Sequence, residues 1–575
     1  MSIDTAPRSY DRADGDRPAP GPRPPVFRRS FSHTGIVVGA LFMAASVTPS
    51  LVPRSGAVQG VVSGITLAIG YGLGAAGSAL WRYLEVPALH GRARTVVLWS
   101  LLGVAGVVIG LQVWQFVGWQ NDQRALMGMN PIGPAVWPVI AGVSAAVFAV
   151  LLVLGRSLRR LTSAVIGRFQ RWLPHRLSTA LGVTVVLLLA WLLFSGLLVR
   201  GFFAAANAMF APRNDINKAG VSAPPTSTLR SGGPGSLVTW QSLGREGRAF
   251  VVKGPTQADL RRQSPAAPAL EPIRVYAGLD SAPTPQARAD LVLAELKRTG
   301  AFDRKVLVLA STTGSGFIQP EGIDPLEYLW HGDTAVAGIQ YSYLPSWLSL
   351  LADQDNAQAA AGAVARTVYA YWQTLPEQSR PKLYLYGLSL GSFGAEGVLG
   401  SIELLNRPID GALLVGPPFL NPLHTRLTAA REPGTPAWRP VYQQGRTVRF
   451  TVQQPTLLSL PGQGSQWGPV RVAYLQHGSD PVVFFSPSQF FSRPEWLDGP
   501  RAPDVSTRLT WYPLVTGWQT LLDLAGAGGV PWGYGHLYDA SENLTSWAAV
   551  TQPPGWTDAQ LADLGHRLNA LPKGD

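Results

Sequence analysis

Five long apolar segments near the N-terminus restrict what this chain can fold into more than any other feature. Each is close to the roughly 20 residues that a helix needs to cross a bilayer. Buried helices of a soluble core are the alternative, but runs of this length with almost no charge favour membrane-spanning helices. A cleavable signal peptide fits poorly, because a long tail precedes the first segment and four more segments follow it. We place the segments at 34–52, 57–81, 95–118, 134–155 and 178–199.

The arginines between these segments predict how the chain is oriented. Cytoplasmic loops carry an excess of Lys and Arg. The tail at 1–33, which is expected to be disordered, and the second and fourth loops are rich in arginine, whereas the first and third loops offer only Arg54 and Arg124. This alternation predicts a helical transmembrane domain at 34–200 with a cytoplasmic N-terminus, and an extracytoplasmic C-terminal part. The arginines of the tail and of the two basic loops are Arg8, Arg12, Arg17, Arg23, Arg28, Arg29, Arg82, Arg92, Arg94, Arg156, Arg159, Arg160, Arg168, Arg171 and Arg176.

The composition agrees with a membrane protein and excludes several classes of function. Of the 575 residues, 46% are hydrophobic and only 14% are charged, which is too apolar for an ordinary soluble protein. The net charge of +12 does not indicate a nucleic-acid partner, because the basic residues near the N-terminus lie between apolar segments and form no patch with aromatic residues. The absence of cysteine excludes disulfides, thiolate nucleophiles and metal sites with cysteine ligands.

After residue 200 the sequence predicts a linker and then an α/β domain. Residues 201–258 contain Pro224-Pro225 and a Gly-rich run at 231–236, which break any long periodicity. From 259 to 575, short β-prone runs alternate with helical ones, a pattern typical of a mainly parallel sheet. Strands are expected before Ser389 and at 273–277, 305–310, 335–343, 411–415, 470–476 and 507–512, with helices at 286–299 and 356–374.

The run 382–394, KLYLYGLSLGSFG, suggests a catalytic serine. An apolar strand breaks at Gly387-Leu388-Ser389-Leu390-Gly391, and a helical segment of small residues follows. A G-x-S-x-G turn between a strand and a helix presents its serine at the tip of a sheet, and its glycines give the room that this turn requires. The pattern alone is weak in a chain so rich in Gly and Ser, but its flanking elements strengthen it. Ser389 is the predicted nucleophile.

A serine nucleophile needs a histidine that accepts its proton, and the α/β-hydrolase order places that histidine after the serine and the acid. His424, His477, His536 and His566 are the histidines that follow Ser389. His424 has no strand to position it, and His566 lies in a charged helical segment. We predict that His536, in a Gly-rich loop after the last strand, is the base. The alternatives are a structural or surface role for His536 and a base at His477, which reads better as a turn residue.

The acid that orients the histidine is predicted to be Asp480. It lies directly beyond the carboxyl end of a predicted strand, where open α/β sheets gather their site residues. Asp before Pro also caps turns, which is the structural alternative. Asp410 is the rival, but it precedes its strand and should lie at the opposite edge of the sheet from Ser389.

Two backbone N–H groups are expected to stabilise the oxyanion of the reaction. One is that of Leu390, next to the nucleophile, and the other comes from the loop 311–316, where Thr313 is the predicted donor. The glycines of this loop suit a phosphate too, but no Lys follows and the P-loop spacing is absent.

Several motifs resemble one known family. They are the runs 48–54 (TPSLVPR), 231–236 (SGGPGS), 332–334 (GDT) and 341–347 (YSYLPSW), together with the Ser389 turn. From about His33 onward, the chain resembles the membrane-anchored α/β-hydrolase family of high-GC Gram-positive bacteria, whose members carry an N-terminal helical membrane domain. The resemblance implies an α/β-hydrolase fold for 259–575 and brings no substrate with it.

Two classes of function are compatible with these features. The first is a membrane-anchored serine esterase or lipase that acts on a lipid or cell-envelope ester through an acyl-enzyme, or an acyltransferase with the same residues. The second is a transport or scaffold protein with a degenerate hydrolase domain. The order Ser389, Asp480, His536 favours the first class. We expect the bilayer and a lipid or envelope ester as partners, no nucleic acid, and neither a cofactor nor a metal.

Overall fold

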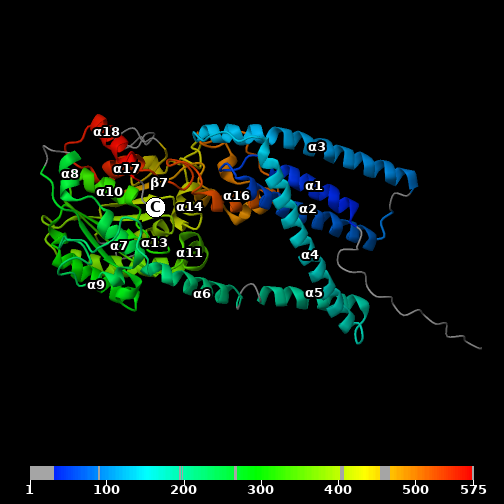
Figure 1. The fold of residues 1–575 in the computed structure, drawn as a ribbon, viewed down its shortest axis with the longest axis horizontal. Helices are drawn as coiled ribbons and strands as arrows, with labels where there is room; N and C mark the ends of the chain where they lie inside the picture. The colour runs from blue at the N-terminus through cyan, green and yellow to red at the C-terminus, as the bar shows by residue number, and fades with distance from the viewer. Residues whose placement is uncertain are drawn as a thin grey trace, which may run out of the picture.

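The fold has an α/β body (residues from 229 onward) at one end and a helical region (residues 31–210) at the other (Figure 1). A computed structural model describes residues 31–87, 91–192, 196, 198–263, 268–401, 407–453 and 466–572. The predicted disordered tail at 1–33 lies outside these residues except for its last three. The two parts meet at helix α16 (Val515–Gly526), which lies between the helical region and the rest of the body.

The α/β body is built on a seven-stranded sheet with the strand order β1-β3-β2-β4-β5-β7-β6. Neighbouring strands pair in parallel throughout the described sheet. Parallel strands that are covered on both faces read as nearly continuous apolar runs, as in β2 with the sequence VLVLAS. The strands are β1 (Ile273–Ala277), β2 (Val306–Ser311), β3 (Thr334–Ile339), β4 (Lys382–Leu388), β5 (Gly411–Val415), β6 (Val448–Thr451) and β7 (Arg471–Leu475).

Helices cover both faces of this sheet. Leu307 and Leu309 of β2 pack into the core on one face, with α9, α12 and α13, whereas Val306 and Val308 pack into the core on the other, with α10, α17 and α18. Side chains alternate along a strand, so both faces need a cover. The helices of the body are α7 (Gly244–Lys253), α8 (Gln257–Gln263), α9 (Pro285–Arg298), α10 (Pro320–Leu329), α11 (Ser346–Ala352), α12 (Gln354–Trp372), α13 (Leu390–Leu399), α14 (Pro422–Ala429), α15 (Pro481–Phe484), α16, α17 (Ala540–Thr551) and α18 (Asp558–Asn569).

One predicted strand is wrong and one strand escapes the sequence pattern. Residues 507–512 form no strand. Leu509 is buried beside Leu51 and Phe484, and Trp511 packs against the same cluster, so the alternation of apolar residues there reflects a half-buried loop. β6 is only four residues long and pairs with β7 alone. A strand that short gives too little periodicity to be recognised.

The predicted linker at 201–258 contains helix α7, which packs on the edge strand β1. A Cβ atom at Gly247 would lie 2.4 Å from the ring of Tyr276 on β1. Arg230 donates to the carbonyl oxygens of Val251 (2.9 Å) and Pro255 (2.6 Å). This part of the linker is therefore folded onto the sheet.

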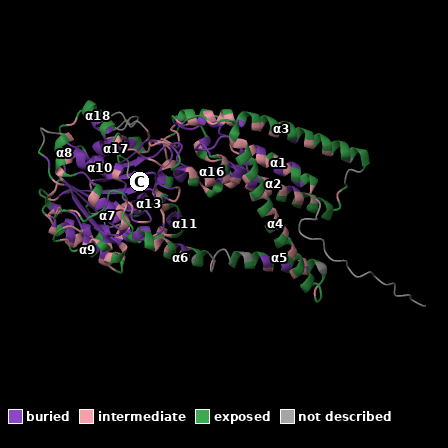
Figure 2. Ribbon diagram, in the orientation of Figure 1, coloured by how far each residue is buried: buried purple, intermediate pink, exposed green. Residues whose placement is uncertain are grey.

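The helical region has the length and composition of membrane-spanning segments. Among the described residues, three helices, at Gly56–Tyr83, Gly91–Leu126 and Pro134–Phe169, are long and apolar enough to cross a bilayer. Large apolar side chains on α3 such as Trp99 (68%) and Trp114 (78%) are exposed, and much of these helices is coloured as exposed or intermediate in Figure 2. Contact with lipid stabilises such a surface, which indicates a membrane-associated protein. The helices of the region are α1 (His33–Ser46), α2 (Gly56–Tyr83), α3 (Gly91–Leu126), α4 (Trp137–Phe169), α5 (His175–Leu192) and α6 (Leu198–Phe210).

The first predicted segment forms a shorter helix than expected. α1 ends at Ser46, six residues before the predicted end, because Pro49 lacks an N–H group and disfavours helical backbone at Thr48. Residues 47–54 run instead against the α/β body, where Leu51 is fully buried. In the fifth segment α5 ends at Leu192 and α6 begins at Leu198, and residues 193–195 and 197 lie outside the described ones.

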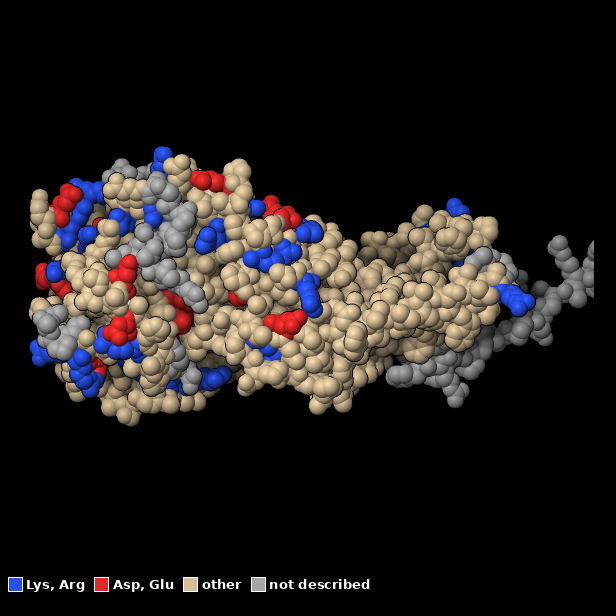
Figure 3. Space-filling model, turned by 90° about the horizontal axis from the view of Figure 1, so that it is seen from above, with Lys and Arg blue, Asp and Glu red and all other residues tan. Residues whose placement is uncertain are grey.

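The long helices run toward and away from the α/β body in turn (Figure 1). The segments after α1 and after α3 touch the body, since Leu51 packs with Phe484 and Met127 packs with Val530. The segments after α2 and after α4 lie at the opposite end. Figure 3 shows few charged side chains along the helices and many on the body. The arginine-poor segments therefore lie beside the body, and the arginine-rich ones lie away from it.

Candidate active site

Ser389 stands in a sharp turn between β4 and α13. Its φ of +53° and ψ of −126° lie outside the regions that most L-residues adopt. The turn is held because the N–H of Ser389 donates to the carbonyl of Val415 (2.9 Å) and the N–H of Ser392 donates to that of Ser389 (2.8 Å). A Cβ atom at Gly387 or at Gly391 would lie only 2.3 Å from backbone atoms. Both glycines are thus required by close backbone approach, as the G-x-S-x-G motif predicts.

Asp480 lies five residues beyond β7 and is fully buried. One carboxylate oxygen, Oδ1, accepts the N–H of Val482 (2.8 Å), so Asp480 also caps α15. The other oxygen, Oδ2, accepts the hydroxyl of Tyr538 (2.6 Å) and lies 2.7 Å from Nδ1 of His536. The carboxylate therefore caps a turn and orients a histidine at the same time.

His536 lies in the loop between α16 and α17. Its N–H donates to the carbonyl of Ala527 (2.9 Å), and its side chain is 17% exposed. The Nε2 atom is buried and has no hydrogen-bond partner among the described residues, Ser389 Oγ included. The ring lies over Gly416, where a Cβ atom would be 2.6 Å from Cε1. Gly416 follows Val415, whose carbonyl holds the N–H of Ser389, so the ring lies beside the Ser389 turn.

Comparison with known families agrees with this fold. Residues 273–564 match the model of an alpha/beta-hydrolase family, and residues 47–255 match the model for the N-terminus of the same family. The chain belongs to this alpha/beta-hydrolase family. No curated protein and no solved structure matches the chain. Membership supports a hydrolase-like activity and covers the helical region as well as the α/β body.

His477 of this family member is a buried supporting residue. Its Nδ1 lies 2.9 Å from the carbonyl of Gly535, and its Nε2 lies 3.1 Å from Oε1 of Glu542. Its ring stacks on Tyr538 with 4.1 Å between centroids. Burial lowers the pKa of His477, but the Glu542 carboxylate outweighs this effect and raises it to about 9. Both ring nitrogens are engaged, so His477 has no free nitrogen with which to accept a proton from serine.

The other rival residues lie away from the Ser389 turn or are engaged elsewhere. His424 is buried, its Nε2 lies 2.6 Å from Gln476 Oε1, and burial lowers its pKa to about 4. His566 is exposed on α18. Asp410 precedes β5 and its Oδ2 accepts the N–H of Leu383 (2.8 Å), near the start of β4, whereas Ser389 follows the end of β4.

The two predicted oxyanion donors differ in their availability. Leu390 is the first residue of α13, and its N–H has no partner among the described residues. The N–H of Thr313 donates to the carbonyl of Phe317 (3.0 Å), so it is already engaged. The loop itself approaches the turn, because a Cβ atom at Gly391 would lie 2.3 Å from the carbonyl oxygen of Ser311. The N–H of Thr312 has no partner within the described part of the chain.

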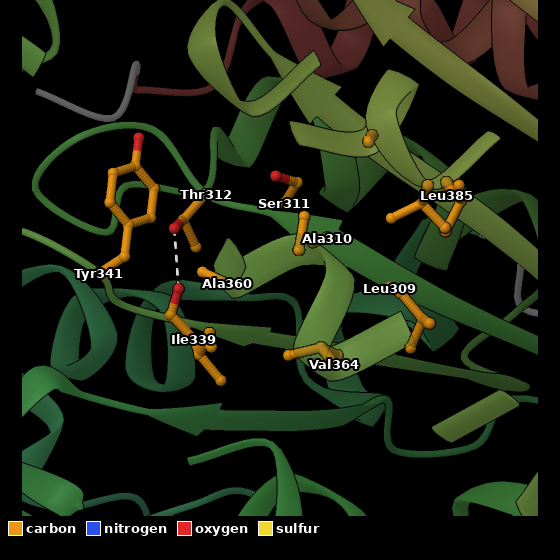
Figure 4. A pocket seen from close by; sticks show the side chains of 12 residues that line it. Leu309, Ala310, Ser311, Thr312, Ile339, Tyr341, Ala360, Val364 and Leu385 are labelled. Atoms are coloured by element: carbon orange, nitrogen blue, oxygen red, sulfur yellow. Dashed lines mark hydrogen bonds between the residues drawn. The ribbon is translucent and has the colours of Figure 1, made fainter. Parts of the chain in front are cut away.

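A small cavity lies behind this loop, between the sheet and the helix pair α12 and α13 (Figure 4). Ser311, Thr312 and Tyr341 are among the residues that line it, and the hydroxyl of Thr312 donates to the carbonyl of Ile339 (2.8 Å). Its volume of about 20 Å³ suits one water molecule. It is far too small for a substrate.

No metal centre competes with this arrangement in the described residues. No group of three or more His, Asp or Glu side chains is placed there to hold a metal ion.

Sequence reasoning does not find three residues that support the site, namely Tyr538, Glu542 and His477. The signal available for Tyr538 is its position two residues after His536, which puts its side chain within reach of the same carboxylate.

Proposed function

We propose that the chain is a membrane-associated serine hydrolase in which Ser389 is the nucleophile, His536 the general base and Asp480 the orienting acid. The contact between His536 Nδ1 and Asp480 Oδ2, at 2.7 Å, carries the proposal. It leaves Nε2 as the free nitrogen, beside the turn that presents Ser389. Catalytic hydrogen bonds in ligand-free proteins are often long and tighten only with substrate, so the unbonded Nε2 is compatible with this role.

In the proposed reaction, the acyl group is transferred first to Ser389 and then to water. His536 Nε2 takes the proton of Ser389 as its oxygen attacks the ester carbonyl, and the Asp480 carboxylate stabilises the imidazolium that forms. His536 then gives this proton to the leaving alcohol, and an acyl-Ser389 remains. Water then attacks the acyl carbon while His536 takes its proton, and His536 gives this proton to Ser389 Oγ as the bond to the acyl group breaks and the acid leaves.

Backbone donors stabilise the negative oxygen of each tetrahedral intermediate. Leu390 supplies one N–H at the N-terminus of α13. Because the N–H of Thr313 is engaged with Phe317, we assign the second donation to its neighbour Thr312. This assignment replaces the predicted Thr313.

A lipid or cell-envelope ester is the substrate class that fits a hydrolase held at a bilayer. The apolar helices α2, α3 and α4 support this choice, because they hold the α/β body close to the membrane surface. We also propose a membrane domain at 34–200 and a catalytic domain at 259–575, with α7 from the segment between them packed on the sheet of the catalytic domain.

Covalent labelling of the full chain in detergent tests the proposal. A fluorophosphonate should label the wild type and leave Ser389→Ala unlabelled, because the probe reacts with an activated serine. The wild type should then hydrolyse esters in a panel of increasing acyl length. Equal labelling of both proteins, or labelling without hydrolysis of any ester, would contradict a serine hydrolase with Ser389 as its nucleophile.

A further inference from the structure

We infer that Arg54 and Asp523 are positioning residues, which join the helical region to α16 and thereby hold the loop that carries His536. The inference rests on the proposed function, since it concerns the general base of that reaction. It gives the helical region a part in catalysis that exceeds anchoring.

The ion pair lies at the centre of a buried polar cluster between the two parts of the protein. Nε of Arg54 lies 2.9 Å from Oδ1 of Asp523, and their side chains are 1% and 0% exposed. Oδ2 of Asp523 accepts the N–H of Leu51 (3.1 Å) and the hydroxyl of Ser50. Asp523 thus binds three groups of the segment 50–54 at once.

Arg54 is fixed in turn by the membrane helices. Its Nη1 donates to Oε1 of Gln59 on α2 (2.7 Å) and to the carbonyl of Ser46 at the end of α1 (3.2 Å). Its backbone N–H donates to Oε1 of Gln120 on α3 (3.0 Å). Arg54 therefore gathers three helices of the helical region at one point.

α16 has a second attachment one turn before Asp523. Nε2 of Gln519 donates to the carbonyl oxygens of Ser46 and Thr48, each at 3.1 Å. Residues four apart lie on one face of a helix. One face of α16 is thus bonded to the end of α1 and to the segment after it. In Figure 1, α16 lies at the end of the α/β body that faces the helical region.

The other end of α16 leads directly into the loop of His536. The carbonyl of Ala527, just after α16, accepts the N–H of His536 (2.9 Å). Val530 of the same loop packs with Val52 and Met127 from the helical region, and Tyr534 packs against this group. The loop between α16 and α17 therefore touches the helical region both through α16 and directly.

Such support adds to the restraints within the loop itself. Gly533 and Gly535 have φ values of +87° and +54°, which favour glycine, and the N–H of Gly535 donates to Ser479 Oγ (3.0 Å) while its carbonyl lies 2.9 Å from Nδ1 of His477. A general base must be held within a fraction of an ångström of its working position, and a displacement of about 1 Å can cost roughly a hundredfold in rate.

Kinetics of the full chain in detergent, with a soluble short-chain ester, test the inference. Arg54→Ala and Asp523→Ala should each lower kcat by about tenfold to a hundredfold, with KM changed less than about twofold. The rate is expressed per Ser389 labelled at the end point by a fluorophosphonate, so that misfolded protein is not counted. Arg54→Lys, which keeps the ion pair, should recover most of kcat.

Arg508→Ala is the matched control. Arg508 Nη1 also pairs across the two parts, with Asp122 of α3 at 3.3 Å, but the two side chains are 60% and 58% exposed. Within the described residues, neither side chain has a hydrogen bond or ion pair to α16 or to the His536 loop. This variant should keep the wild-type kcat. Met127→Ala, which removes an apolar contact to the loop and leaves the ion pair intact, should lower kcat in the same direction as Arg54→Ala.

The outcomes separate this inference from the proposed function. If wild type is labelled and active but Arg54→Ala, Asp523→Ala and Met127→Ala keep the wild-type kcat per labelled site, the positioning role is wrong and the serine hydrolase stands. If Arg508→Ala lowered kcat as much as Arg54→Ala, the positioning role would also be wrong. The effect would then come from any contact between the two parts and would not need the attachment to α16. A wild type that is neither labelled nor active contradicts the proposed function itself.

Discussion

Ser389 and His536 act as one unit in the proposed reaction, so removing either should have about the same effect. Without His536 the hydroxyl of Ser389 keeps its proton, and without Ser389 the base has no nucleophile to activate. We expect Ser389→Ala and His536→Ala each to lower kcat by about a millionfold, and the double variant to cost little more. Steady-state hydrolysis by the full chain in detergent measures this. If the double variant lost the product of the two single losses in kcat, Ser389 and His536 would act independently, which would contradict their role as one unit.

Asp480 follows a strand of the sheet, whereas Asp410 precedes one. The two aspartates therefore form a matched pair for mutation. Asp480→Asn should lower kcat by roughly ten-thousandfold, because an amide leaves the His536 ring in the wrong tautomer. Asp410→Asn should retain most of the activity, since Asp410 binds the N–H of Leu383 far from Ser389. A crippled Asp410→Asn beside an active Asp480→Asn would mean that the acid is wrongly assigned.

The buried pair of His477 and Glu542 should make stability depend on pH. The pKa of His477 is raised to about 9, so its contribution is complete below about 6.5 and is lost as the pH rises through about 9. Burial raises the pKa of the Glu542 carboxyl at the same time, which offsets part of this stabilisation. The Tm should therefore fall between pH 7 and 10, and Glu542→Gln should flatten this fall. His566→Gln, at an exposed histidine of α18, should leave it unchanged.

Sequence signals single out the candidate catalytic residues more readily than the residues that hold them in place. Ser389, Asp480 and His536 could be chosen because a turn motif, a strand end and a Gly-rich loop each have a local signal. The bond between His477 and Glu542 joins residues 65 positions apart, and no local pattern indicates it. The engagement of the Thr313 N–H depends on the conformation of its loop, which the sequence gives only as an approximate turn.

At the scale of single elements, two of the three glycines of α13 have opposite surroundings. A Cβ atom at Gly391 would lie 2.3 Å from the carbonyl oxygen of Ser311, whereas one at Gly397 would meet only Gln358 side-chain atoms at 3.6 Å. Gly391→Ala should push the start of α13 away from the loop, destabilise the fold by about 1–3 kcal/mol and lower the rate of fluorophosphonate labelling. Gly397→Ala should label normally and gain up to about 1 kcal/mol, since Ala favours helix.

Thermal unfolding and the labelling rate of both variants check this prediction. If both substitutions were harmless, the close approach of α13 to the loop of Ser311 would not matter for the site. If both were harmful, the defect would belong to the helix as a whole and not to the Ser389 turn.

The buried strands could be predicted because their apolar runs are continuous, as parallel packing between two helical layers requires. The bounds of β1 and β5 agree with the prediction. The end of α1 could not be predicted from hydropathy alone, because Val47, Leu51 and Val52 are apolar for a different reason. They pack against the rest of the protein and not against lipid.

At the scale of the whole molecule, the joint between the two parts escapes sequence reasoning most completely. Arg54 and Asp523 are 469 positions apart, and each alone reads as an ordinary charged residue at the end of an element. In the sequence Arg54 counts as a loop arginine, but its side chain is 1% exposed and paired. The alternation of arginine-rich and arginine-poor loops still holds. Because Arg54 is paired with Asp523, its loop carries no unpaired positive charge that would favour a cytoplasmic position.

We propose that the α/β body lies on the extracytoplasmic side. The segments after α1 and α3 that touch the body carry few arginines, and those at the far end carry many, which is the distribution that places the far end in the cytoplasm. An export-dependent reporter enzyme fused after Asp575 should therefore be active in a bacterial host. The same reporter fused within the segment after α4, near Leu173, is the control and should be inactive. Protease added to intact spheroplasts should digest the body, and digestion only after the membrane is opened would reverse the orientation.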